Sequence, residues 1–167
     1  MKASAAVSNV FRRFLLLILA CDLTTSCRFQ EEHQKQMELK DMLAAVRNDR
    51  IKFATMRPPG SQFASLERRV IVTGPPELVE LSASDDPQVL NHLVELLRDR
   101  DRAWAAEVLL AAMTRREDKI VDSFAATPDQ WWDAVGKTAY DRWNSWLNES
   151  RDKLVWDSEN KVFVETR

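Results

Sequence analysis

Glu107 is the residue whose setting in the sequence most clearly invites chemistry. It is the one charged residue between Ala103 and Met113, in a run that is otherwise apolar. A carboxyl group held in apolar surroundings can have a raised pKa and act as a general acid. The alternative is that Glu107 lies on a narrow solvent-facing strip of a helix, or pairs with Arg100 or Arg102. We favour this structural role over a catalytic one.

Residue types that other catalytic chemistry needs are scarce. The sequence holds two histidines, His33 and His92, and two cysteines, both within the first 27 residues. It contains no His-Glu-x-x-His zinc motif, no Gly-x-Ser-x-Gly nucleophile elbow and no glycine-rich phosphate loop. Three glycines in all make it hard to cradle a phosphate with backbone amides. We therefore expect a protein that is not an enzyme and that uses neither a metal ion nor a cofactor.

The six tryptophans form the second informative group, because exposed aromatic rings bind sugars and proteins. Trp131 and Trp132 are adjacent, so they cannot both face one side of a helix. Trp132 and Trp146, together with His92, are the candidate binding surface, for another protein or for cell-wall glycan. The alternative is that the tryptophans build a large aromatic core. Those that we expect in the core are Trp104, Trp143 and Trp156.

The first 20 residues have the three parts of a secretory signal peptide. Lys2, Arg12 and Arg13 form the positive region, and the apolar run over 14–20 is shorter than the roughly 20 residues that cross a bilayer. A buried core helix is the alternative, but it would place two arginines directly beside an apolar run. We predict a signal peptide over 1–20 and an exported product.

The sequence Ile18-Leu19-Ala20-Cys21 resembles the lipobox of bacterial lipoproteins, although Leu19 is bulkier than usual at its position. The resemblance implies that Cys21 is lipidated, and that the product is anchored on the periplasmic side of the cell membrane. Several acyl chains, at about 0.8 kcal/mol per buried methylene, give a stable anchor. Asp22 resembles the inner-membrane retention signal of enteric lipoproteins. The alternative is ordinary cleavage nearby, with Cys21 or Cys27 left free or Cys27 modified instead.

Charge and composition narrow the class of partner. The intact chain has a net charge of -2, and loss of residues 1–20 leaves 21 basic and 26 acidic residues. A mildly acidic product lacks the basic patch of a nucleic-acid-binding protein, whereas a basic partner stays open. With 45% hydrophobic and 30% charged residues and few glycines, the composition is typical of a globular helical protein. No cysteine remains for a disulfide inside the folded domain.

The elements that must position these residues are mostly helices. The run around Glu107 is rich in strong helix formers and apolar nearly all round, so it predicts a central helix buried on most faces. Pro58-Pro59-Gly60 stops any helix and is the best internal boundary. We expect a tether over 21–34, an amphipathic N-terminal helix over 35–56, and a helical domain with a tryptophan-rich cap over 57–167. Residues 61–72 could form a short helix or an extended segment.

Further local signals divide the last 90 residues. Short helices are expected over 77–83, 87–98 and 115–124. The Thr127-Pro128-Asp129-Gln130 capping box begins a helix that Gly136 closes, and another helix follows to about Asn148. Two apolar runs around a polar turn, Leu154–Trp156 and Val162–Val164, predict a C-terminal β-hairpin that packs on the helices.

Part of this pattern resembles the HEAT-repeat family of α-solenoids, over roughly 76–124. The residues that carry the resemblance are Asp85-Asp86-Pro87, the run 93–97, the polar turn 98–102, and Ala103, Ala105, Ala106, Leu109 and Leu110. It implies a protein-binding scaffold of antiparallel helix pairs. The tryptophan-rich tail and the hairpin depart from the family. We expect a mainly α fold, either a compact antiparallel bundle or a short HEAT-like solenoid, with a C-terminal hairpin.

These observations favour a non-catalytic, membrane-anchored protein that binds another protein in the periplasm. Both an envelope-assembly factor and an immunity protein against a toxin fit. The alternative is a peptidoglycan-binding lipoprotein that uses exposed tryptophans.

Overall fold

The computed structural model describes residues 33–56, 69–116 and 127–166. The chain divides into two compact units, 1–40 and 41–167. In the first unit, residues 33–40 are helical, and the Gln34 side-chain amide donates to Glu38 one turn further on at 3.2 Å. The elements that follow belong to the second unit.

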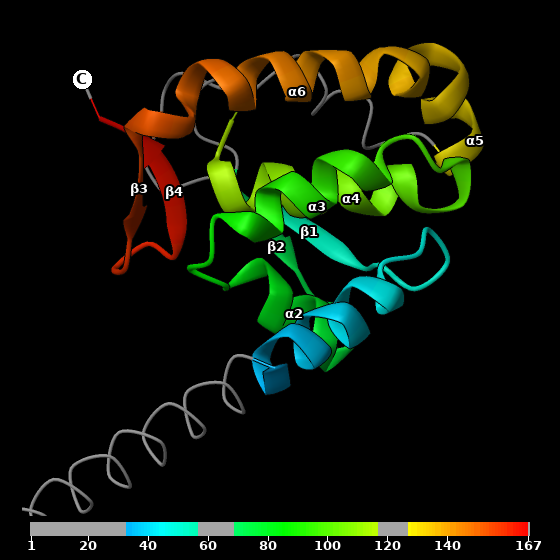
Figure 1. The fold of residues 1–167 in the computed structure, drawn as a ribbon. Helices are drawn as coiled ribbons and strands as arrows, with labels where there is room; N and C mark the ends of the chain where they lie inside the picture. The colour runs from blue at the N-terminus through cyan, green and yellow to red at the C-terminus, as the bar shows by residue number, and fades with distance from the viewer. Residues whose placement is uncertain (1–32, 57–68, 117–126, 167) are drawn as a thin grey trace, which may run out of the picture. The chain divides into compact units, whose positions relative to one another are not determined.

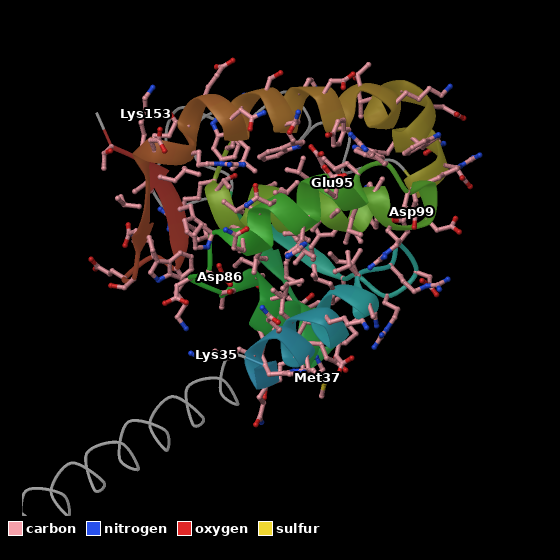
Figure 2. The ribbon with its side chains drawn as sticks, viewed as in Figure 1. Lys35, Met37, Asp86, Glu95, Asp99 and Lys153 are labelled. Carbon is pink, nitrogen blue, oxygen red and sulfur yellow. The ribbon has the colours of Figure 1, made fainter. Side chains whose placement is uncertain are left out.

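Helix α4, Arg100–Thr114, lies at the centre of the second unit, as the apolar run around Glu107 predicts. Leu109 and Leu110 have no exposed surface. Asp99 begins the helix, and its carboxylate accepts the backbone N–H of Asp101 at 3.0 Å (Figure 2). The cap therefore lies within the polar turn 98–102 that the sequence places before the apolar run.

Elements on opposite sides cover α4 (Figure 1). Helix α3, Gln88–Leu96, packs on α4 and on α6, Lys137–Ser150, which runs along them on the side away from α2. Helix α2, Pro76–Ser82, packs on α4 from the other side. Each neighbour buries one apolar stripe, such as Leu78 and Leu81 of α2, whereas α4 is buried nearly all round.

The described residues also form two small antiparallel hairpins. Strand β1, Phe53–Met56, pairs with β2, Arg69–Val72, and β3, Leu154–Asp157, pairs with β4, Val162–Glu165. The mainly helical class and the C-terminal hairpin are thus confirmed. Of the two alternatives for residues 61–72, the extended one holds over 69–72, where β-branched residues suit a half-buried strand; the rest lie outside the described residues.

The helix predicted over 35–56 is too long. The helical residues end at Ala45, and residues 53–56 are strand β1. Between them, Val46 and Ile51 are buried, so this connection packs as part of the second unit instead of ending a separate helix. The proline-glycine stop at 58–60 follows strand β1 in the sequence and not a helix. A pattern of apolar residues at helical spacing could not indicate that strand.

Side chains tie this connection to the beginning of α4. The Asn48 amide donates to the Arg100 carbonyl at 2.7 Å and accepts the Ala105 N–H at 3.1 Å. The Arg102 guanidinium donates to the carbonyls of Leu43 and Val46, the second at 3.0 Å. The Arg102 guanidinium thereby pairs carbonyl groups at and just after the helix end at Ala45, where carbonyls have no partner within the helix itself.

The C-terminal helices begin with the predicted capping box. Helix α5, Pro128–Trp131, follows Thr127, whose side chain accepts the Gln130 N–H while the Gln130 side chain accepts the Thr127 N–H. A π-helical turn, η2 (Trp132–Gly136), then leads directly into α6. The prediction that Gly136 closes the helix is wrong. A β-carbon at Gly136 would lie 2.7 Å from the Trp131 ring, so close packing explains the glycine.

After α6, a 3-10 turn, η3 (Arg151–Lys153), leads into β3. The short helix expected over 115–124 lies outside the described residues except for Arg115 and Arg116, which are not helical. In the described part of the chain, no helix has the length and apolar character that crossing a membrane requires.

Candidate functional site

Glu107 is fully buried at the contact between α4 and α6. Its Oε2 accepts the indole N–H of Trp143 at 2.6 Å, and both side chains are at most 1% exposed. The expected solvent strip or pairing with Arg100 or Arg102 is therefore wrong in geometry, because the carboxylate points into the core. Glu107 has no exposed surface and its described contact is made inside the core.

Trp146 lies beside Trp143 and is also enclosed, with 9% of its surface exposed. The two rings meet edge to face with centroids 5.4 Å apart, and the Arg116 guanidinium lies 5.0 Å above the Trp146 ring. The Trp146 indole N–H donates to Glu165 of β4 at 2.6 Å. Trp146 thus connects α6 to the C-terminal hairpin, and its prediction as an exposed binding residue is wrong.

Glu165 is the titratable group most affected by this contact. The Trp146 indole and then the Ser150 hydroxyl, which donates at 2.8 Å, hold the pKa of the Glu165 carboxyl below its usual value. Hydrogen bonds to the charged form are the physical cause. The ionised carboxylate is therefore part of the attachment of β4 to α6.

The remaining candidate residues do not gather into one surface. His92 of α3 is exposed, and Trp132 of η2 is half-buried beside the fully buried Trp131, with ring centroids 6.5 Å apart. Trp132 and Trp146 are 14 positions apart along helical backbone, or roughly 20 Å at 1.5 Å per residue. One small ligand could not touch both rings.

The other tryptophans divide between core and edge. Trp143, predicted in the core, is buried, whereas Trp104 and Trp156 are half-buried. Trp104 packs edge to face on Phe53 of β1 at 5.5 Å, which attaches the first hairpin to α4. The aromatic-core alternative therefore accounts for half of the set: Trp131, Trp143 and Trp146 are buried, and the other three tryptophans are half-buried.

The predicted lipidation site, Cys21, lies outside the described residues, as do Cys27, the signal peptide over 1–20 and nearly all of the tether over 21–34. Within the described residues, no group of three or more His, Cys, Asp or Glu side chains is placed to hold a metal ion.

A groove that the sequence did not predict opens between the two hairpins. Its volume is about 320 Å³, at the lower end of the range for ligand pockets. The walls come from β2, α2, the last turn of α4 and the β3–β4 turn. The lining residues are Val70, Ile71, Val72, Val79, Ser82, Ala83, Ala112, Arg115, Asn160, Lys161 and Val162. We call this feature the hairpin groove.

The hairpin groove has an apolar wall and a basic end. Val79 of α2 is 41% exposed, whereas Leu78 and Leu81 of the same helix have no exposed surface. Arg115 and Lys161 stand at the other end, and both adopt positive φ angles, 47° and 54°. These are the non-glycine residues with positive φ in the described part of the chain: Arg115 ends α4 in the left-handed conformation, and Lys161 lies in the turn between β3 and β4.

A small polar network holds the basic end in place. Arg115 donates to the Asn160 side chain at 2.8 Å, and the Asn160 amide donates to Asp157 at 2.7 Å. The backbone N–H of Asn160, followed by its side chain, holds the pKa of the Asp157 carboxyl below its usual value, and the Arg115 charge adds to this. The β3–β4 turn is therefore fastened to the end of α4.

Some residues of the hairpin groove could be recognised from the sequence, but not the groove itself. The β-branched run Val70-Ile71-Val72 was visible, and the exposed position of Val79 could be read from its place beside the apolar stripe of α2. Nothing local brings residues 70–83 next to 112–115 and 160–162. Comparison of the chain with protein-family models, with curated proteins and with solved structures gave no match.

Proposed function

We propose that this protein is a non-catalytic, membrane-anchored module that binds another protein on the periplasmic side of the membrane, through the hairpin groove. The observation that carries the proposal is a groove with an apolar wall, a basic end and an exposed Val79. Exposed aliphatic side chains next to fixed polar groups are typical of binding sites. Either an envelope-assembly factor or an immunity protein would use such a surface.

Anchoring is supported by the N-terminal sequence. The signal-like residues 1–20 and the lipobox-like residues before Cys21 would place the helical domain outside the cytoplasm, on the tether over 21–34. The antiparallel neighbours α3 and α4, joined by a short polar turn, support a HEAT-like helix pair as the scaffold. In solenoids of that kind, neighbouring helices build the binding surface.

Burial of the tryptophans speaks against the glycan alternative. Sugar-binding sites stack rings on open aromatic faces, whereas Trp146 is enclosed under Arg116 and Trp132 is half-buried. The full burial of Glu107 speaks against the catalytic alternative in the same way.

Site-specific photo-crosslinking in intact cells tests the proposal. A benzophenone amino acid at Val79 or Lys161 should give a discrete protein adduct, because both side chains reach the hairpin groove. The matched control positions are His92 and Asp133, which are exposed and do not line the groove. Equal adducts at all four positions, or none at Val79 and Lys161, would contradict the proposal.

Two further experiments test the lipid anchor and, independently, whether the ligand is a protein or a glycan. Cys21→Ser should release the protein from membranes, and a protein that stays bound would refute lipidation at Cys21. A peptidoglycan pull-down should retain none of the protein. Retention that Trp132→Ala abolishes would instead support the glycan alternative.

A further inference from the structure

The register of the first hairpin determines which backbone groups of β2 are available. The Thr73 N–H donates to the Lys52 carbonyl at 2.8 Å, so these two residues form a hydrogen-bonded pair. Hydrogen-bonded and non-hydrogen-bonded pairs alternate along antiparallel strands. The pairs Phe53–Val72 and Thr55–Val70 are therefore non-hydrogen-bonded, and Val70 and Val72 direct their N–H and C=O groups away from β1.

This outward edge of β2 forms a wall of the hairpin groove. Val70, Ile71 and Val72 all line it, as expected where the edge of a strand, not one face, borders a pocket. In the described part of the chain, β1 is the strand that pairs with β2, and no second strand lies on the other edge. Unpaired strand edges are templates for strand addition.

The surroundings of that edge specify the chemistry of a partner. Val79, Ala83 and Ala112 offer apolar contacts to the side chains of a segment lying along β2. Lys161 is exposed at the basic end, whereas the neighbouring Arg115 is bonded to Asn160 and its charge already acts on Asp157. A carboxylate on the incoming segment would therefore be attracted to Lys161, while alternate apolar residues would face the α2 wall.

We propose that the hairpin groove binds an extended, carboxylate-bearing segment of a partner protein, which adds as a strand to the edge of β2 that faces away from β1. This inference rests on the proposed function and specifies how the partner is recognised. The open strand edge favours a peptide over a small amphiphile, because backbone hydrogen bonds supply the affinity in strand addition.

The experiment begins with selection of linear peptides from a displayed random library against the folded protein. Selected peptides should be rich in β-branched residues and carry an aspartate or glutamate. In amide hydrogen-exchange measurements by NMR, they should protect the N–H groups of Val70 and Val72. Failure of the selection, or protection elsewhere, overturns the proposal.

Two pairs of variants then test the geometry. Val70→Pro removes an outward N–H without touching the β1–β2 ladder, and it should weaken peptide binding by roughly tenfold, the value of one hydrogen bond. The matched control, Val70→Thr, keeps the N–H and should bind as the parent does. Lys161→Glu should weaken binding more than Lys161→Asn, which removes the charge but tolerates the positive φ. Thermal unfolding checks that each variant is folded.

Other outcomes identify other occupants and each overturns the proposal. Shifts at Val70 and Val72 on titration with decanoate, without peptide selection, would make the hairpin groove a site for fatty acids. Concentration-dependent protection of the same amides would indicate a second copy of this chain. If crosslinking at Val79 succeeds while Val70→Pro leaves binding unchanged, the proposed function survives and strand addition fails.

Discussion

The two sides of α4 are built on opposite principles. On the side of α6, Glu107, Trp143 and Trp146 are buried together, and both indole N–H groups donate to carboxylates, Trp143 to Glu107 and Trp146 to Glu165. On the side of the hairpin groove, Val79 remains exposed, β2 pairs on one edge alone among the described strands, and two residues hold positive φ angles. Close packing of this kind stabilises the fold. Exposed apolar side chains and unpaired backbone groups instead gain free energy when a partner covers them.

On the buried side, the Glu107 carboxyl group has no exposed surface, so its stability in the core depends on hydrogen-bond donors within the protein. A carboxylate removed from water costs free energy unless hydrogen bonds replace its hydration. The Trp143 indole supplies such a bond to Glu107. Because a hydrogen bond is directional, it fixes the position of α6 along α4 as well as the distance between the two helices. We therefore expect changes on the α6 side to alter stability and changes in the hairpin groove to alter binding.

The largest effect is expected at Trp143. Trp143→Ala should lower the free energy of unfolding by about 3–5 kcal/mol through the cavity that it creates. Trp143→Phe keeps most of the ring but removes the donor to Glu107, and it should cost about 1–3 kcal/mol. Urea denaturation measures both. The half-buried Trp132→Ala is the control, and an equal loss there would contradict the comparison.

A smaller loss is expected at Gly136. An alanine β-carbon would lie 2.7 Å from Trp131 and 2.8 Å from Trp132, closer than packed side chains allow. Gly136→Ala should therefore lower the unfolding free energy by about 1–3 kcal/mol, although alanine favours helices. Ala134→Gly, at an exposed helical position, is the matched control for propensity. A gain in stability in Gly136→Ala would show that the tryptophan rings move aside easily.

A pH-dependent effect is expected where β4 joins α6. The folded-state pKa of Glu165 is lowered, so its contribution is complete above the unfolded-state pKa and is lost as pH falls through the folded-state value. The difference in melting temperature between the parent and Glu165→Gln should be present at neutral pH and shrink below about pH 4.5. Melting curves across this range measure it, with Glu149→Gln on the exposed face of α6 as the control. A difference that does not change with pH would refute the contribution of the charge.

The smallest effect on stability is expected in the hairpin groove. Val79→Thr should change the unfolding free energy by no more than about 0.5 kcal/mol, because the side chain is 41% exposed. The same substitution should weaken binding of the selected peptides. Val155→Thr, another exposed valine outside the groove, should leave binding unchanged. A large loss of stability in Val79→Thr would remove the distinction between the two sides.

Local signals explain why much of the fold could be predicted. For several elements, the signals that define them lie within a few neighbouring residues. These are the apolar run of α4, the capping box at Thr127 and the two apolar runs of the C-terminal hairpin. The misses occurred where a local signal was ambiguous. The helix expected over 35–56 ends at Ala45, and residues 46–52 connect it to β1 through contacts such as those of Asn48 with α4. Gly136 reads as a stop, although packing against Trp131 is the reason for it.

The amino-acid sequence by itself determined that this protein is mainly helical, that α4 lies at its centre, and that the C-terminal residues form a hairpin. These properties follow from backbone propensity and apolar periodicity, which act over a few residues. Tertiary structure alone decided that Glu107 meets Trp143, 36 positions away, and that β2 and the β3–β4 turn border one groove. Such contacts depend on how distant surfaces fit together, and no local pattern encodes that fit.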